Sequence, residues 1–168
     1  MIFVTVGTHE QPFNRLLEQI DKLVENGVIT EEVIVQSGFC TYKPEHCIYQ
    51  KLFTYTEMEK YVLDARIIIT HGGPSSFLMP VKIGKIPVVI PRKFKFGEHI
   101  NDHQVNFSHA VASRMGNIIV VENVEKIGEV IKNYSDIVSH MRAKFENNND
   151  IFCKQFEQIV ENLFEGIK

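Results

Sequence analysis

Residues 67–77 read Ile-Ile-Ile-Thr-His-Gly-Gly-Pro-Ser-Ser-Phe, and the rest of the chain is interpreted around them. The first four residues are β-branched and uncharged, which is typical of a buried strand. His71-Gly72-Gly73 then predicts a tight turn. Pro74 suits the first turn of a helix, and Ser75 and Ser76 suit its cap. The free backbone N–H groups of such a turn attract an anion, best of all a phosphate. A plain strand–turn–helix corner would use the same glycines, so both interpretations stay open here.

The composition is that of a globular protein of one domain. The 168 residues are 44% hydrophobic and 23% charged, and the formal net charge of −3 argues against a general nucleic-acid binder. Three cysteines form no CxxC pair, so we expect free thiols that serve as small apolar side chains in a reducing cytosol: Cys40, Cys47 and Cys153. No basic leader and no membrane-spanning apolar run is visible in the sequence, which predicts a cytoplasmic protein.

Strand-like segments alternate with segments of helical period. We expect strands at residues 2–6, 32–36, 48–53, 67–70, 86–91 and 117–121. We expect helices at residues 13–25, 56–64, 74–83, 101–115 and 125–133. This alternation predicts an α/β fold of the Rossmann-like, three-layer α/β/α kind, with a mainly parallel sheet. The predicted domain covers residues 1–134, and a helical extension covers residues 135–168.

Three loops follow predicted strands and should therefore meet at one edge of the sheet. They begin at Gly7, at His71 and at Arg92, and the third runs to Gln104. Ligands of parallel sheets bind beyond the carboxyl ends of the strands, so this convergence predicts a binding site. The first loop is not the dinucleotide fingerprint, because GxGxxG needs three glycines and only Gly7 is present.

The C-terminal residues predict an amphipathic helix with a narrow apolar stripe. The stripe contains Phe152, Phe156, Ile159, Val160, Leu163 and Ile167. Residues 135–145 also read as helical, and polar residues 146–150 separate the two segments. We expect the stripe to pack on its own domain; docking on a partner protein or on a membrane surface is the alternative.

Residues 71–76 and 102–104 together resemble the C-terminal, donor-binding half of GT-B glycosyltransferases of family 28. Residues 4–8 are similar to the first strand and loop of that family, and residues 84–91 to its nucleotide-sugar segment; the likeness covers about residues 1–121. It is strongest with small bacterial exopolysaccharide and capsule transferases whose two halves are separate polypeptides. It extends to the small catalytic subunit of the enzyme that adds the second N-acetylglucosamine to dolichol-linked sugar.

The resemblance implies a UDP-sugar donor and no cofactor. Its donor-binding residues would be Gly7, Thr8, His71, Gly72, Gly73, Ser75, Ser76, Asp102 and Gln104. The diphosphate would lie at the central turn, and Asp102 and Gln104 would bind hydroxyls of the transferred sugar. Without the resemblance, Asp102 reads as a helix cap and Gln104 as part of a solvated helix face. Met79 stands where many relatives carry a glutamate for the ribose, so the ribose is held otherwise or donor selectivity differs.

The chemistry requires stabilisation of the leaving UDP and a base for the acceptor hydroxyl. Backbone dipoles at the His71 turn suit the first task. His9 and Glu10 are the local candidates for the base, and the absent acceptor half is the other source. His99 and His103 lack a carboxylate cluster, so we expect no metal site. Inversion at the anomeric carbon and independence of metal are what the family implies.

The family also implies a second half that binds the acceptor. We therefore expect a membrane-associated acceptor-binding subunit, which recruits this chain to the inner face of the cell membrane, and a lipid-diphosphate-linked saccharide as acceptor. The C-terminal helix and the basic, aromatic residues 92–96 are candidates for these contacts, although such a loop is more often solvated. The expected role is transfer of galactose, glucose or N-acetylglucosamine in exopolysaccharide or capsule biosynthesis. The alternatives are a non-catalytic nucleotide-binding accessory subunit and a UDP-sugar epimerase of related fold.

Overall fold

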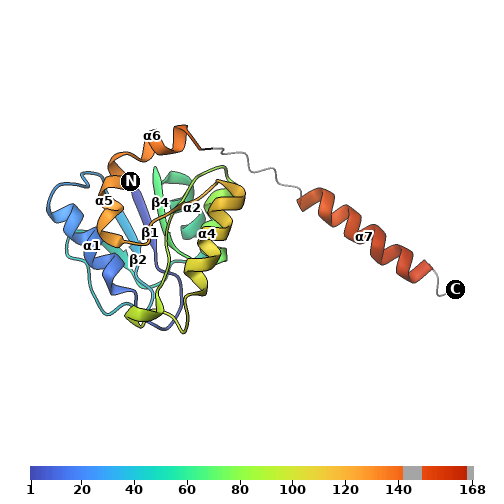
Figure 1. Ribbon diagram of the computed structural model, residues 1–168, viewed down its shortest axis with the longest axis horizontal. Helices are drawn as coiled ribbons and strands as arrows, with labels where there is room; N and C mark the ends of the chain where they lie inside the picture. Colours follow the sequence, from blue (N-terminus) through green and yellow to red (C-terminus); the bar gives the residue numbers. More distant parts are fainter. Residues whose placement is uncertain (142–148, 166–168) are drawn as a thin grey trace.

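Six parallel strands form the centre of the protein in the computed structural model, which describes residues 1–141 and 149–165 (Figure 1). The strands are β1 (Ile2–Thr5), β2 (Val33–Gln36), β3 (Ile48–Gln50), β4 (Ile67–His71), β5 (Val88–Ile90) and β6 (Ile119–Val120). The α-helices are α1 (Asn14–Glu25), α2 (Tyr55–Asp64), α3 (Pro74–Lys82), α4 (His103–Met115), α5 (Ile127–Lys132), α6 (Tyr134–Ser139) and α7 (Asn149–Glu165). Two short 3-10 turns are η1 (Phe94–Phe96) and η2 (Val124–Lys126).

The strand order is β3-β2-β1-β4-β5-β6, and every pairing is parallel, which confirms the predicted fold class. The chain builds outward from β1 to β3 and then returns to place β4 on the other side of β1. Thr5 of β1 lies opposite Gln36 of β2 and Thr70 of β4, so these three strands end within one residue of the same level. The order reverses between β1 and β4, which is where doubly wound sheets bind their ligands.

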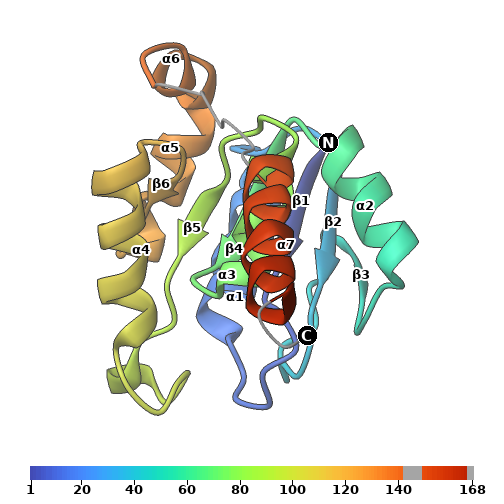
Figure 2. The same cartoon turned by 90° about the vertical axis from the view of Figure 1, so that its right-hand side faces the viewer.

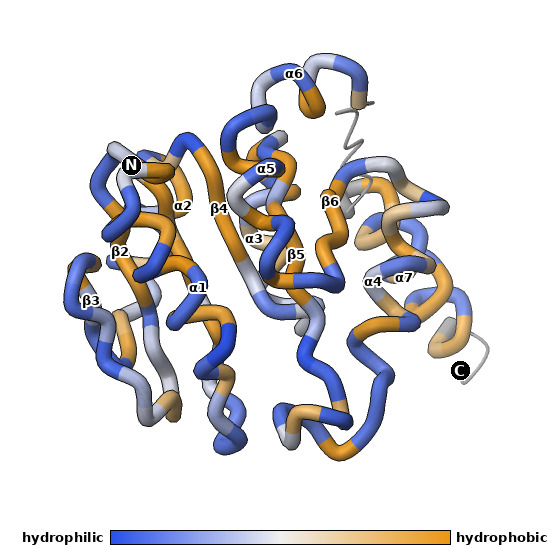
Figure 3. The backbone as a smooth tube through the Cα atoms, turned by 60° about the vertical axis from the view of Figure 1, so that its left-hand side comes forward, coloured by the Kyte–Doolittle hydropathy of each residue, from blue (hydrophilic) through white to orange (hydrophobic). Residues whose placement is uncertain are grey.

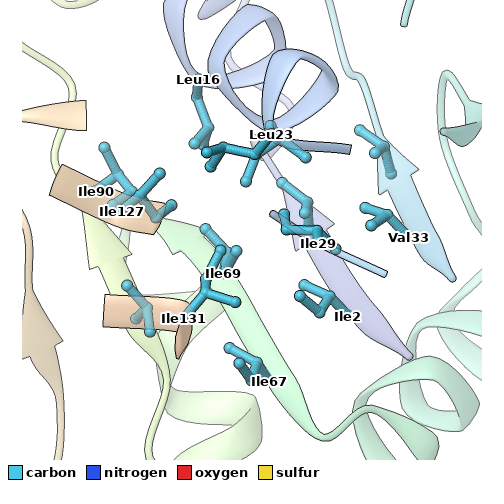
Figure 4. Close-up of a cluster of buried hydrophobic side chains, with 14 of the residues drawn as sticks. Ile2, Leu16, Leu23, Ile29, Val33, Ile67, Ile69, Ile90, Ile127 and Ile131 are labelled. Atoms are coloured by element: carbon cyan, nitrogen blue, oxygen red, sulfur yellow. The ribbon is translucent and has the colours of Figure 1, made fainter. Parts of the chain in front are cut away.

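Helices cover both faces of the sheet, and the buried strands alternate between them. Ile2 and Val4 face α1 and α5, whereas Phe3 faces α2. Figure 4 shows the larger cluster, with labelled side chains from the strands, from α1 and α5, and from the loop after α1: Ile2, Leu16, Leu23, Ile29, Val33, Ile67, Ile69, Ile90, Ile127 and Ile131. The hydrophobic strands lie between more polar helices in Figure 3. Each fully buried aliphatic side chain contributes roughly 1.5–3 kcal/mol of transfer free energy, so these layers hold the loops at the sheet edge in place.

Some element boundaries differ from the predicted ones. α2 begins at Tyr55 because Thr54, and not Thr56, is the cap: its hydroxyl accepts a hydrogen bond from the N–H of Glu57, whose side chain accepts one from the N–H of Thr54. The predicted helix over residues 125–133 is divided into η2 and α5. At the predicted domain boundary, the buried hydroxyl of Tyr134 donates to the carbonyl oxygen of Ile86 at 2.6 Å. The start of α6 is therefore tied to the sheet domain.

The apolar stripe of α7 does not pack on the sheet domain, so this expectation was wrong. Phe152, Phe156, Ile159 and Leu163 are between 57% and 66% exposed, and α7 stands apart from the rest of the chain in Figure 1. Figure 2 shows the sheet behind α7, with α2 and α4 at its two sides. The two faces of the sheet already pack against α1 and α5 on one side and against α2, α3 and α4 on the other. Ile167 lies outside the described residues, as do residues 142–148 of the segments expected before α7.

The three cysteines differ in burial. Cys40 and Cys47 are half-buried against the core, as small apolar side chains would be, but Cys153 on α7 is exposed, so the expectation of an apolar filler was wrong there. Within residues 1–141 and 149–165, no helix is long and apolar enough to cross a membrane.

Candidate functional site

A pocket of about 530 Å³ opens at the carboxyl ends of β1 and β4, where the strand order reverses. Its size is in the range of small-molecule sites. The lining residues are Thr5, Gly7, Thr8, His9, Gln36, Phe53, Tyr55, Met58, His71, Ser75, Ser76 and Met79. Six of the residues expected in the site are among them: Gly7, Thr8, His9, His71, Ser75 and Ser76. The expected residues that do not line the pocket are Glu10, Gly72, Gly73, Asp102 and Gln104.

The imidazole of His71 lies between two glycines. We had expected His71 in the turn, but it is the last residue of β4. A Cβ atom at Gly7 would lie 2.8 Å from Nε2 of His71, and a Cβ atom at Gly73 would overlap the same nitrogen. Gly7 also has φ of +76°, a conformation that favours glycine. Both glycines are therefore needed for the ring to occupy this position.

His71 enters the pocket as a neutral group. It is 8% exposed, and its Nδ1 atom is buried without a hydrogen-bond partner among the described residues. Burial, together with the positive charge of Arg92, lowers the pKa of His71 to about 4. At neutral pH the ring therefore offers a hydrogen bond to an anion but no charge.

The start of α3 supplies free donors beside this ring. Gly73 is the N-cap of α3 and Pro74 is its first residue, so Ser75 and Ser76 lie in the first turn and not at the cap. Within the described part of the chain, the N–H groups of Gly73 and Ser75 have no acceptor. With the two serine hydroxyls and the positive end of the helix dipole, these groups can bind an anion.

Gln104 holds the central turn from the neighbouring loop. It is 7% exposed, and its Oε1 atom accepts hydrogen bonds from the N–H of Gly72 at 3.0 Å and from the N–H of Arg92 at 3.2 Å. The interpretation as a solvated helix face was therefore wrong. The Oε1 atom and the Gly72 N–H are occupied within the protein, so only the Nε2 group of Gln104, which bonds to no described residue, remains for a ligand.

Asp102 shapes the loop after β5. Its Oδ1 atom accepts a hydrogen bond from the N–H of Phe94 at 2.9 Å, which closes the η1 turn. Asp102 is the N-cap residue of α4 by position, but its side chain makes no capping hydrogen bond. The cap expected from the sequence alone is therefore absent, and one exposed carboxylate oxygen stays free at the sheet edge.

His9 and Glu10, the candidate bases, differ in environment. The Nδ1 atom of half-buried His9 accepts a hydrogen bond from the N–H of Gln11 at 3.2 Å, so neutral His9 carries its proton on Nε2. Burial and the nearby charges of Arg92 and His99 lower the pKa of His9. The ring presents a donor in this arrangement and becomes a base only when it releases Gln11. Glu10 is exposed and lies outside the pocket lining.

Arg92 is the residue that the sequence interpretation misjudged most. It is fully buried, whereas a solvated basic loop was the more common expectation. Its guanidinium donates to the carbonyl oxygens of Val6, Gln11 and Glu98 at 2.8, 2.6 and 3.1 Å. The predicted convergence of the three loops is therefore confirmed, and Arg92 is the side chain that joins two of them. Its place directly after a buried strand was the available signal.

Part of the pocket lining is apolar and was not anticipated. Phe53, Tyr55, Met58 and Met79 line it, and Phe53, Met58 and Met79 pack against the core cluster beneath α2. Aromatic rings and thioethers suit a flat organic group. Among the described residues, no cluster of three metal-ligating side chains is present.

A pocket with free hydrogen-bond donors at the start of α3 and apolar side chains in its lining, at this point of a doubly wound sheet, agrees with the comparisons to known proteins. The family model of the glycosyltransferase family 28 C-terminal domain matches residues 1–163. The chain belongs to this family. The match continues past residue 121, where the resemblance was expected to end, and includes most of α7. No curated protein sequence matches the chain.

Solved glycosyltransferases share the fold of this family 28 domain. MurG from Acinetobacter baumannii is 15% identical with a TM-score of 0.55, over 80% of this chain and 41% of that one. The glycotransferase of kitacinnamycin is 13% identical with a TM-score of 0.56, over 82% of this chain and 36% of that one. SnogD from Streptomyces nogalater is 16% identical with a TM-score of 0.50, over 79% of this chain and 34% of that one. The chain thus spans about two fifths or less of the length of these enzymes.

Proposed function

We propose that this family 28 domain is the catalytic, donor-binding subunit of a two-component glycosyltransferase. It would transfer galactose, glucose or N-acetylglucosamine from a UDP-sugar to a lipid-diphosphate-linked saccharide in exopolysaccharide or capsule biosynthesis. The observation that carries the proposal is the pocket at the β1–β4 switch point, with free donors at the start of α3 and apolar side chains in its lining.

The polar and the apolar residues of the pocket would contact different parts of a nucleoside diphosphate. The diphosphate fits at Gly73, Ser75 and Ser76, where N–H and hydroxyl groups are free. The nucleoside fits between Phe53 and Met79, where an aromatic ring and a thioether provide contact without charge. The thioether of Met79 is only a weak acceptor for the ribose hydroxyls, so in this subunit the nucleobase and the diphosphate would supply most of the nucleotide affinity.

The same groups serve the chemistry. Negative charge grows on the UDP oxygen as the bond to the sugar breaks, and fixed dipoles at the start of α3 stabilise that charge without reorganising. The acceptor hydroxyl must lose a proton, and His9 is the nearest local base once its Nδ1 atom is free. Asp102 and the Nε2 group of Gln104 would contact the hexose from the loop after β5.

We assign the contacts with the acceptor to a second, membrane-associated acceptor-binding subunit. The exposed stripe of α7 provides an apolar surface for it, and the charged residues among 151–164 are Lys154, Glu157 and Glu161. A helix of net negative charge is poorly suited to an anionic membrane surface. We therefore assign α7 to the protein partner, which would hold the chain at the cytoplasmic face of the membrane.

Calorimetry of UDP, UDP-glucose, UDP-galactose and UDP-N-acetylglucosamine tests the donor site. We expect binding of UDP, preference for one sugar, and about a tenfold or greater loss of affinity in Ser75→Ala, since hydrogen bonds to charged groups contribute roughly 1.5–3 kcal/mol. Ser113→Ala is the matched control, because Ser113 is exposed on α4 away from the pocket. Equal losses in both variants, or no binding of any nucleotide by the wild type, would reject the site.

Transfer assays with the co-expressed partner separate the alternatives. Transfer that survives His9→Ala, Glu10→Ala, Asp102→Ala and Gln104→Ala would indicate an accessory subunit that activates another transferase. Release of free epimerised sugar nucleotide without acceptor would indicate an epimerase.

A further inference from the structure

The buried guanidinium of Arg92 is surrounded by carbonyl groups, and within the described part of the chain it touches no carboxylate. Arg92 is fully buried, and its Nη atoms donate to the carbonyl oxygens of Val6, Gln11 and Glu98. Its Nε atom is buried without a partner among the described residues. A buried charge is expensive unless an opposite charge compensates it. Carbonyl dipoles alone offset only part of this cost.

The nearest carboxylate is already engaged. Glu98 accepts hydrogen bonds from Nε of Arg15 at 2.6 Å, from Nη2 of Arg15 at 3.0 Å and from the N–H of Lys93 at 2.9 Å. The ring of Phe13 lies 5.0 Å from the guanidinium carbons of both Arg15 and Arg92. The one carboxylate beside the two guanidinium groups is thus paired with Arg15, and the positive charge of Arg92 is left without a paired carboxylate among the described residues.

The positive charge of Arg92 affects residues that line the pocket. Arg92 bonds to Val6 directly before Gly7, and its N–H shares the Oε1 atom of Gln104 with Gly72. The positive charge contributes to the lowered pKa values of both His9 and His71, which line the pocket. Its field therefore reaches the two side chains that stand where the anion would bind.

We propose that Arg92 is the buried counter-charge of the donor diphosphate. It positions the loops after β1 and β5 through its hydrogen bonds, and it stabilises the diphosphate through space without touching it. This inference rests on the proposed function of the pocket as a UDP-sugar site. Because negative charge on UDP increases as the sugar departs, the same field favours the transition state. Arg92 is a positioning residue and not a catalytic one.

The test compares a neutral ligand with a charged one. Calorimetry gives the ratio of UDP affinity to uridine affinity in the wild type, in Arg92→Lys and in Arg92→Met. We expect Arg92→Met to lower this ratio about 10- to 100-fold, because a unit charge that acts through a medium of intermediate dielectric constant contributes on this scale. Arg92→Lys keeps the charge and should keep most of the ratio. A folded Arg92→Met protein with an unchanged ratio would overturn the inference.

A spectroscopic measurement separates the charge from loop packing. In NMR titrations, the pKa of His9 should rise in Arg92→Met and stay low in Arg92→Lys. Both variants retain the side chains of Glu10 and His99, whose charges also act on His9. A rearranged loop without an electrostatic role would not give opposite results in these two variants. An unshifted His9 pKa in folded Arg92→Met would also overturn the inference.

Gln104→Glu provides a variant that keeps the guanidinium in place. A carboxylate oxygen still accepts from the N–H groups of Gly72 and Arg92, but its charge compensates Arg92. We expect a lower ratio of UDP to uridine affinity, and an unchanged ratio would contradict the proposal. If the wild type bound uridine but not UDP, both the inference and the proposed function would fail. If the wild type bound UDP more tightly than uridine and the variants kept the same affinity ratio, only the inference would be rejected.

Discussion

The Oε1 atom of Gln104 lies 3.0 Å from the backbone nitrogen of Gly72 and accepts its hydrogen bond. The two residues are 32 positions apart in sequence, and the contact joins the start of α4 to the turn after β4. A Cβ atom at Gly72 would come within 2.9 Å of the Gln104 side chain, so the glycine is needed for this approach. The shape of the turn after β4 thus depends on a side chain from another loop.

Gln104→Leu should destabilise the fold and weaken nucleotide binding. The change leaves the buried N–H groups of Gly72 and Arg92 without an acceptor, at a cost of about 1–3 kcal/mol each. Urea denaturation should show a loss on the order of 2–5 kcal/mol in the free energy of unfolding. Asn106→Leu, at an exposed position of the same helix, is the control and should change it by less than about 0.5 kcal/mol. Similar values for both variants would contradict the role assigned to Gln104.

Three glycine-to-alanine changes separate backbone strain from collision with His71. Gly84 has φ of +77° and open space around it, so Gly84→Ala should cost only the left-handed penalty of about 1–2 kcal/mol. Gly73 has φ of −78°, so Gly73→Ala tests the collision alone. Gly7→Ala combines both effects and should be the least stable in thermal denaturation. Only Gly7→Ala and Gly73→Ala should lose UDP affinity; a loss in Gly84→Ala would point to a different cause.

The free energy of unfolding should decrease as the pH falls from 6.5 to about 4, because of His71. The folded-state pKa of His71 is lowered from 6.5 to about 4. Unfolding therefore takes up a proton between these values, and the contribution of His71 is complete above pH 6.5 and lost as the pH falls to 4. At about 1.4 kcal/mol per pKa unit, the total is on the order of 3 kcal/mol. His71→Gln should show a shallower decrease in unfolding free energy over this range, and parallel curves would refute the assignment.

Substitutions in the stripe of α7 should leave the stability of the sheet domain unchanged. Phe156→Ser and Ile159→Ser remove exposed side chains, so the free energy of unfolding should change by less than about 0.5 kcal/mol. Ile69→Ala, at a fully buried strand position, is the contrast and should cost about 2–5 kcal/mol. A large loss in the α7 variants would mean that the stripe packs within the folded chain.

Met79→Glu should create discrimination between ribose and deoxyribose. The wild type has a thioether at this pocket position, so it should bind UDP and 2′-deoxy-UDP with affinities within about threefold, which is under 1 kcal/mol. A carboxylate at residue 79 can accept hydrogen bonds from ribose hydroxyls and should favour UDP by about tenfold. Calorimetry of both nucleotides measures the ratio, and Met79→Gln tests whether a neutral acceptor is enough.

Much of the fold was predictable because the relevant signals are local. Three isoleucines before His71-Gly72-Gly73 indicate a buried strand and a turn without any knowledge of their neighbours. Parallel strands place their carboxyl ends at one edge, so the meeting of the loops after β1, β4 and β5 also followed. The family signature could be read in the same local segments, and the family match agrees with it.

The roles of individual side chains depended on distant partners. The Arg92 guanidinium bonds to Val6 across 86 positions, and no local pattern distinguishes this buried arginine from a solvated one. Gln104 and Asp102 were expected at the ligand, but much of their bonding capacity is used within the protein.

The sequence alone therefore determined the order and type of the elements, the sheet edge that carries the site, and the family. Only the tertiary structure decided which atoms of that edge are free for a ligand, where the uncompensated charge lies, and that the stripe of α7 stays exposed. Secondary structure follows from periodicity over a few residues, whereas burial, hydrogen-bond partners and pKa values depend on groups that the chain brings together from far apart.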